Sequence, residues 1–195
     1  MKIYSHRVNT KIALQGTDLS LGVEIDLRSR LGSLILSHDP FVNGELFSDW
    51  LTCWRGQPLI LNVKEDALEE AIIGALSEYD ISDYFFLDQS YPSIRRMVQQ
   101  GMTKVATRVS DFEDLTTALL SGSEWVWLDS FSGNWSYLPE VVPRLSKNNQ
   151  KTCLVSPELQ RLESQDELRD LQRILNLNNL NITAVCTKNP ERWES

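Results

Sequence analysis

The 195-residue sequence has few of the residues that build thiolate metal centres or disulfide frameworks. Its three cysteines, Cys53, Cys153 and Cys186, lie far apart and form no Cys-x-x-Cys pair, so we expect half-buried core thiols, and neither structural zinc nor disulfides. No apolar run approaches the roughly 20 residues of a membrane span. The first seven residues also lack the apolar region of a signal peptide. We therefore expect a cytoplasmic protein with no membrane insertion.

Positive charge is also scarce. The chain has 19 Lys and Arg against 27 Asp and Glu, which gives a net charge of −8. Binding to a long nucleic acid depends on neutralising many phosphates, so we do not expect nucleic acid as a partner. A small anionic substrate needs only two or three well-placed cations and stays compatible with this composition.

Strand and helix patterns alternate along the chain. Short β-branched or aromatic runs are each followed by a stretch with helical spacing. The predicted strands are residues 2–6, 22–27, 58–64, 83–88, 104–109, 124–129, 151–155 and 181–187, and residues 33–38 form a hairpin return after the turn at Leu31-Gly32. The predicted helical segments are residues 10–21 (one or two turns only), 66–79, 93–100, a helix opened by a capping box of Ser110 and Glu113, and residues 165–175.

Eight strands that alternate with helices predict a parallel α/β fold. We expect one domain over residues 1–195, a small (β/α)₈ TIM barrel with an abbreviated first βα unit and a β-hairpin insertion after strand 2. The chain is short for such barrels, which typically have about 250 residues. An open doubly wound sheet is the alternative, but no Gly-x-Gly-x-x-Gly follows any predicted strand.

Ionisable residues gather at the carboxyl ends of the predicted strands, where a barrel carries its active site. Glu24, Asp26 and Arg28 share one face of the second strand, because successive side chains of a strand alternate between its faces. Each residue alone also has a plainer structural explanation, such as a helix cap, a solvated strand edge, a salt bridge or a packed ring. Taken together, the candidates are His6, Arg7, Glu24, Asp26, Arg28, His38, Asn62, Lys64, Arg108, Trp127 and Asp129.

These residue types fit phosphoryl chemistry. Glu24 and Asp26 supply oxygen ligands for Mg²⁺ or Ca²⁺, and such an ion polarises a phosphoryl oxygen. His6 and His38 are the only histidines, and imidazole moves protons in either direction near neutral pH. Near the barrel mouth, Trp127 offers a ring for stacking on a sugar or inositol.

The early motifs resemble those of the glycerophosphodiester phosphodiesterase family, within the phosphatidylinositol phospholipase C-like phosphodiesterases. That family's His-Arg, Glu-x-Asp and His-Asp occur here as His6-Arg7, Glu24-Ile25-Asp26 and His38-Asp39. Its third-strand Glu-x-Lys reads Asn62-Val63-Lys64. Its closing Thr-Asp-x-Pro is similar to residues 187–190, and the resemblance is sharp over about the first third of the chain.

The resemblance implies a role for each matching residue. His6 and His38 would be the general acid and base, and Arg7 and Lys64 would bind the phosphoryl oxygens. Glu24 and Asp26 would ligate the divalent metal, with Asn62 standing where the family usually has a third carboxylate. The attacking oxygen would come from water or from a neighbouring substrate hydroxyl, which would give a cyclic product.

Two further departures follow the first strand. The family's usual Gly after His-Arg is Val8 here, and its Glu-Asn-Thr survives only as Asn9-Thr10. We therefore weigh a phosphodiesterase for a small substrate against a barrel that has lost turnover and binds a phosphorylated ligand as a sensor or partner-binding module. A barrel aldolase or isomerase with Lys64 as a Schiff-base lysine is a third possibility, but its neighbourhood offers no apolar pocket signature.

Overall fold

The computed structural model describes residues 1–160 and 165–194, which form an α/β fold. The chain divides into two compact units: residues 4–93 (the N-terminal unit), and residues 1–3 with 94–195 (the C-terminal unit). Strand β1 (Lys2–Ser5) and helix α4 (Tyr91–Gln99) each have residues in both units. The expected single domain and the closed barrel stay predictions.

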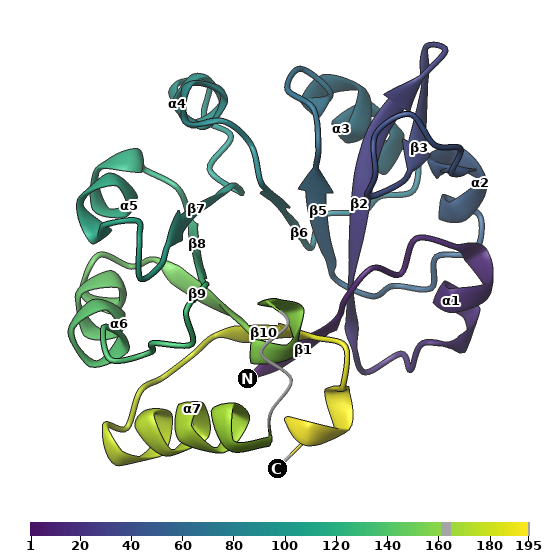
Figure 1. The fold of residues 1–195 in the computed structure, drawn as a ribbon. Coiled ribbons are helices and arrows are strands. Elements are labelled where there is room, and N and C mark those ends of the chain that lie inside the picture. Colours follow the sequence, from purple (N-terminus) through teal and green to yellow (C-terminus); the bar gives the residue numbers. More distant parts are fainter. Residues whose placement is uncertain (161–164, 195) are drawn as a thin grey trace. The chain divides into compact units, whose positions relative to one another are not determined.

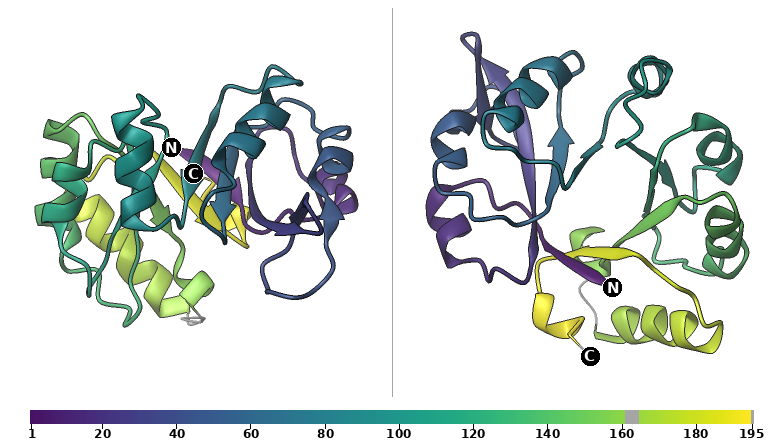
Figure 2. Two further views of the ribbon diagram at one scale, coloured as in Figure 1. Left: turned by 90° about the horizontal axis from the view of Figure 1, so that it is seen from above. Right: turned by 180° about the vertical axis from the view of Figure 1, so that it is seen from behind.

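The N-terminal unit is a sheet with helices on one side. Its parallel strands are β1, β2 (Gly22–Arg30), β5 (Leu59–Val63) and β6 (Tyr84–Leu87), while β3 (Ser33–Leu36) and β4 (Glu45–Leu46) continue the sheet antiparallel. The helices α1 (Lys11–Gly16), α2 (Phe47–Leu51) and α3 (Glu69–Ser77) lie on the same side of its strands in Figure 1 and Figure 2.

Local sequence explains why β2 runs longer than the predicted 22–27. Leu31 and Gly32 both have positive φ, 51° and 81°, which is the backbone of a two-residue type I′ turn. This turn pairs Arg30 with Ser33, so the antiparallel ladder extends β2 to Arg30, three residues beyond the last residue that pairs with β5. The hairpin therefore projects past the parallel part of the sheet.

The C-terminal unit repeats the strand–helix alternation. Its parallel strands are β7 (Ala106–Val109), β8 (Trp125–Leu128), β9 (Lys151–Val155) and β10 (Ala184–Thr187). The helices are α5 (Leu115–Ser121), α6 (Leu138–Lys147) and α7 (Gln165–Leu177), with short 3₁₀ segments at Pro157–Gln160 and Pro190–Arg192. Apolar residues from strands and helices, among them Val126, Leu154, Leu145 and Leu171, form one buried core.

Several element boundaries correct the sequence predictions. Ser110 Oγ accepts the expected bond from the Glu113 N–H, but the Ser110 hydroxyl, not its backbone N–H, donates to the Glu113 carboxylate, and α5 begins only at Leu115, with Asp114 as its N-cap. The box thus closes a turn that precedes the helix. Helices α2 and α6 lie outside the predicted segments. Pro143 lies inside α6, where burial of four apolar side chains outweighs the hydrogen bond that proline cannot make.

Candidate active site

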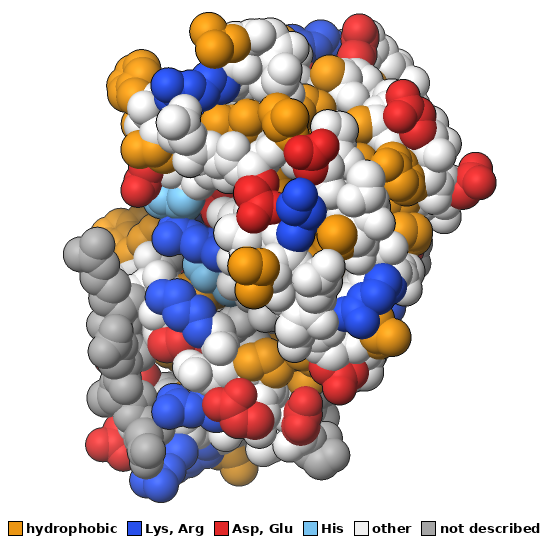
Figure 3. Space-filling model, turned by 90° about the vertical axis from the view of Figure 1, so that its right-hand side faces the viewer, with side chains coloured by type: hydrophobic (Ala, Val, Ile, Leu, Met, Phe, Trp, Pro, Cys, Tyr) orange, Lys and Arg blue, Asp and Glu red, His pale blue; other side chains and the backbone are white. Residues whose placement is uncertain are grey.

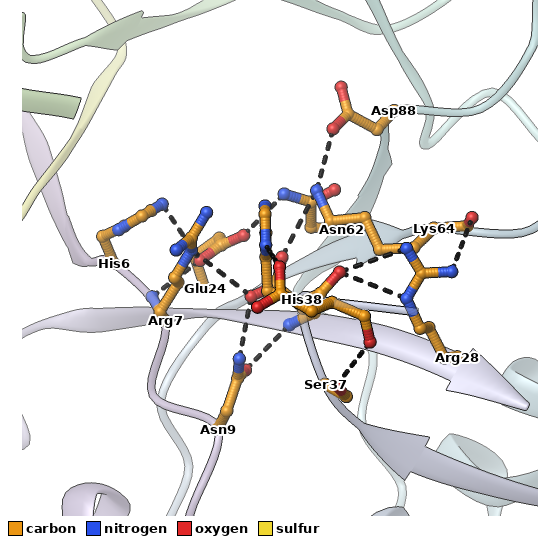
Figure 4. A network of polar contacts seen from close by, with 12 residues as sticks. His6, Arg7, Asn9, Glu24, Arg28, Ser37, His38, Asn62, Lys64 and Asp88 are labelled. Carbon is orange, nitrogen blue, oxygen red and sulfur yellow. Dashed lines mark hydrogen bonds and ion pairs between the residues drawn. The ribbon is translucent and has the colours of Figure 1, made fainter. Parts of the chain in front are cut away.

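The centre of the candidate site is a pair of buried carboxylates on β2. Glu24 and Asp26 both have no solvent exposure. They share a strand face, and the parallel pairing of β2 with β5 sets Asn62 directly beside Asp26. Asn62 donates its Nδ2 to Glu24 Oε1 at 2.8 Å. The strand register therefore gathers three of the predicted residues into one cluster, of which Figure 4 labels Glu24 and Asn62.

The segment after β1 wraps onto this cluster. Arg7 takes a left-handed backbone conformation (φ 56°) that turns its N–H toward Glu24 Oε2, at 2.7 Å. His6 Nε2 lies 3.9 Å from the same oxygen. Asn9 and Asp26 exchange two hydrogen bonds of 2.8 Å, since Asn9 Nδ2 donates to the carboxylate and the Asp26 N–H donates to Asn9 Oδ1. Both carboxylates thus hold the first loop in place.

Burial shapes the charge of the cluster. Desolvation, followed by the neighbouring Asp26 carboxylate, raises the pKa of Glu24 to about 7. Cations approach from two sides: Arg7 Nε lies 3.6 Å from Asp26 Oδ2, and Lys64 Nζ lies 3.3 Å from Asp26 Oδ1. Two buried oxygens, Asp26 Oδ1 and Asn62 Oδ1, have no hydrogen-bond partner. A further cation bound to these oxygens would reduce the repulsion between the Glu24 and Asp26 carboxylates and would give both oxygens a partner.

His38 and Lys64 are joined through Arg28. The Arg28 guanidinium donates twice to the His38 carbonyl at 3.1 Å, and once to the Lys64 carbonyl at 3.4 Å. The His38 ring donates Nδ1–H to the Asp39 carboxylate at 2.7 Å, and this bond lowers the pKa of Asp39. Both histidines reach the surface, and Figure 3 shows them on one face beside Lys and Arg side chains.

Three solved structures of glycerophosphodiester phosphodiesterases match this chain over nearly its whole length. The enzyme of Agrobacterium tumefaciens is 13% identical with a TM-score of 0.71, and covers 99% of this chain and 98% of its own. The Thermotoga maritima enzyme is 14% identical with a TM-score of 0.71 and coverages of 98% and 96%. That of Parabacteroides distasonis is 12% identical with a TM-score of 0.70 and coverages of 97% and 93%.

The chain has the fold of the glycerophosphodiester phosphodiesterases. No protein-family model and no curated protein matches the sequence. The resemblance drawn from the early motifs is therefore confirmed at the level of the fold.

Three predicted residues belong to the C-terminal unit, whereas the cluster belongs to the N-terminal unit. Arg108 pairs with Glu113, with Nε 2.8 Å from Oε2. Trp127 is buried. Asp129 is buried and accepts two hydrogen bonds from Gln160, and its burial raises its pKa to about 6. Their role as ligand contacts stays a prediction.

Four residues that contact or support the candidate site were not predicted as site residues. Asn9 pairs with Asp26, Asp88 binds Lys64, and Asp39 orients the His38 ring. Buried Trp50 donates its indole N–H to the Val8 carbonyl at 2.9 Å, which fixes the loop that carries His6. Short polar residues just after a strand were a usable signal for Asn9 and Asp88, whereas no local pattern pointed to Trp50.

Proposed function

We propose that this protein is a metal-dependent phosphoric diester hydrolase. The observation that carries the proposal is the buried cluster of Glu24, Asp26 and Asn62, with His6 at its edge and Lys64 against it. A structural core has no need of two carboxylates without solvent exposure on one strand face. The fold shared with glycerophosphodiester phosphodiesterases supports the same reaction class.

The donor set fits a hard divalent cation. Glu24, Asp26 and Asn62 would hold Mg²⁺ or Ca²⁺ through oxygen atoms, two of which, on Asp26 and Asn62, lack a hydrogen-bond partner. Among residues 1–160 and 165–194 no three His, Cys, Asp or Glu side chains are grouped so that they could hold a metal ion, and the donor set that we infer includes the amide oxygen of Asn62. When bound, the ion supplies charge that polarises a phosphoryl oxygen.

The chain's own residues would supply proton transfer and charge. His6 and His38 would act as general base and general acid, one taking the proton of the attacking hydroxyl and the other protonating the leaving alkoxide. The Asp39 carboxylate holds His38 Nδ1–H, which leaves Nε2 for the reaction. Arg7 and Lys64 would bind the phosphoryl oxygens as cations.

The substrate we infer is a small glycerophosphodiester or sugar phosphodiester. A net charge of −8 argues against a polyanionic nucleic acid. In the two ranges that the structure covers, no helix is long and apolar enough to cross a bilayer. Cys53, Cys153 and Cys186 are all free thiols, which fits the reducing cytoplasm.

The proposal is tested by hydrolysis of bis-p-nitrophenyl phosphate and glycerophosphocholine with EDTA, Mg²⁺ or Ca²⁺. We expect metal-dependent turnover that falls at least about 10²-fold in His6→Ala and in His38→Ala, because each removes one partner of the proton transfer. Circular dichroism and thermal unfolding establish that both variants are folded.

Two outcomes would contradict this function. Turnover that persists in EDTA and in both histidine variants would assign the reaction to other residues. A folded wild type that turns over neither substrate, yet binds a phosphodiester in a calorimeter, would favour the ligand-binding module instead.

A further inference from the structure

Lys64 is held between two carboxylates from different strands. Its Nζ lies 3.3 Å from Asp26 Oδ1 in the buried cluster, and donates a hydrogen bond of 3.0 Å to Asp88 Oδ2 beyond it (Figure 4). The Lys64 side chain is 13% exposed and that of Asp88 is 34% exposed. Asp88 therefore lies at the open side of the ammonium group and Asp26 at its closed side.

The backbone is specifically arranged to bring Asp88 to this point. Asp88 directly follows β6, and Leu87, the last residue of β6, pairs with Asn62 on β5. Asp88 and Lys64 therefore stand at the ends of two neighbouring strands. Asp88 has a φ of 65°, a left-handed conformation that is strained for most residues other than glycine. Ser90 then ties the loop after β6 to the loop after β5 through its hydroxyl and N–H, both bonded to Asp66.

A hollow of about 310 Å³ opens at this place in the N-terminal unit. It is lined by Val63, Lys64, Glu65, Asp66, Asp88, Gln89 and Ser90. Lys64 is thus one of the residues that line this hollow, together with Asp88. A lysine ammonium has three donor hydrogens; Asp88 accepts one of them, while Asp26 Oδ1, 3.3 Å away, is an ion-pair partner only.

We propose that Asp88 is the positioning residue for Lys64, which rests on the proposed function in assigning the phosphoryl oxygens to Lys64. The four-carbon stem of lysine has many rotamers, so a second anchor fixes the ammonium in one place. Asp88 also draws the ammonium away from full pairing with Asp26, which leaves the Asp26 carboxylate available to a cation. Without Asp88, Lys64 settles against Asp26 and presents less of its charge to the substrate.

The test combines Asp88→Asn with a matched control, Asp80→Asn. Asp80 is exposed and has a φ of 54°, so the same substitution is made in the same backbone conformation away from Lys64. We expect Asp88→Asn to raise KM at least about fivefold with a smaller effect on kcat, and Asp80→Asn to change neither. In a Lys64→Met background, Asp88→Asn should have no further effect, because its action passes through the ammonium.

A second readout does not depend on turnover. In ¹³C-lysine-labelled protein, the Lys64 Cε signal, assigned by its loss in Lys64→Met, should shift in Asp88→Asn and stay in place in Asp80→Asn. Inorganic phosphate should perturb this signal less in Asp88→Asn than in wild type. The positioning role is overturned if the Lys64 signal does not change in Asp88→Asn. It is also overturned if Asp88→Asn still raises KM in the Lys64→Met background. If the wild type shows no turnover but the Lys64 signal shifts as expected, the hydrolase function is contradicted and the positioning role of Asp88 is not.

Discussion

At the scale of single residues, Asn62 is the most informative departure from the expected site. It is nearly buried, and its amide donates a hydrogen bond to a carboxylate that is already costly to ionise. An amide in this place stabilises the pair of acids when no cation is bound. It also removes one negative charge from the set that would attract a cation.

Asn62→Asp should therefore separate metal binding from stability. Without a cation we expect a loss of about 1–3 kcal/mol in the free energy of unfolding, because a donor is removed and a third carboxylate is added beside Glu24. With Ca²⁺ or Mg²⁺ we expect affinity to rise about tenfold or more. Thermal unfolding in EDTA and in saturating Ca²⁺, together with calorimetric titration, measures both effects.

The control for this substitution is Asn43→Asp, an exposed asparagine of the same unit. It should leave both stability and metal affinity nearly unchanged. If Asn62→Asp binds either cation no more tightly than wild type does, these oxygens are not the metal site.

The sequence predicted the residues of the cluster better than their partners. His6 follows a strand, and Glu24 and Asp26 share one face of β2, so the local pattern was enough to group them as candidates. Which strand ends adjoin one another depends on pairing between distant segments, as between Asp26 and Asn62, and no local pattern encodes that. The contacts of Lys64 with Asp88 and of Asn9 with Asp26 followed only from the folded backbone.

At the scale of elements, the short helix α2 supports the loop after β1. Its Trp50 has no solvent exposure and stacks on Phe47 with ring centroids 6.2 Å apart. The indole N–H reaches back to the carbonyl of Val8, two residues after His6. A helix of five residues thus stabilises part of the site from outside it.

Trp50→Phe should weaken both the fold and the site. We expect a loss of about 2–3 kcal/mol in urea unfolding, from a buried carbonyl left without its donor and from a smaller ring in the core. We also expect kcat to fall, because the loop that carries His6 loses an anchor. Trp54→Phe is the comparison: it removes a similar indole bond, to the Gln57 carbonyl, and should lower stability without lowering kcat. Equal effects of the two variants on kcat would rule out a specific role of Trp50.

The same elements show why segment boundaries were harder to predict than strand number. Ser110 and Glu113 have the sequence of a capping box and form one of its two bonds, yet Asp114 also caps well and stands next to the apolar face of α5. The choice between two adequate caps is made by packing of Leu115 and Ala118, which local sequence does not reveal. Burial of apolar side chains likewise explains why α6 forms, although Pro143 disfavours a helix at its position.

At the scale of the whole molecule, Asp129 links stability to pH. Its burial raises its pKa from 3.8 to about 6, so the folded state holds this proton more tightly than the unfolded state does. Between these two pH values the folded state binds more protons. The contribution of this group to stability is therefore fully present below pH 4 and declines as pH rises toward 6.

Asp129→Asn should remove this dependence. Relative to wild type, the variant should gain on the order of 2–3 kcal/mol of unfolding free energy between pH 4 and pH 7, since two pKa units correspond to about that amount. Urea unfolding of both proteins across this range measures the difference. The comparison between the two proteins cancels the titration of other groups. A difference that is constant with pH would mean that Asp129 titrates alike in the folded and unfolded states.

The three bonds of Arg28 bear on how far such a sequence can diverge. Its guanidinium holds the loops of His38 and Lys64 by their carbonyl oxygens, and every amino acid offers the same carbonyl. These bonds place no demand on the side chains that surround the two site residues. One arginine thus preserves the course of two loops while their sequences drift. This chain is only 12–14% identical to the three solved enzymes and has their fold, and bonds to backbone carbonyls are compatible with so low an identity.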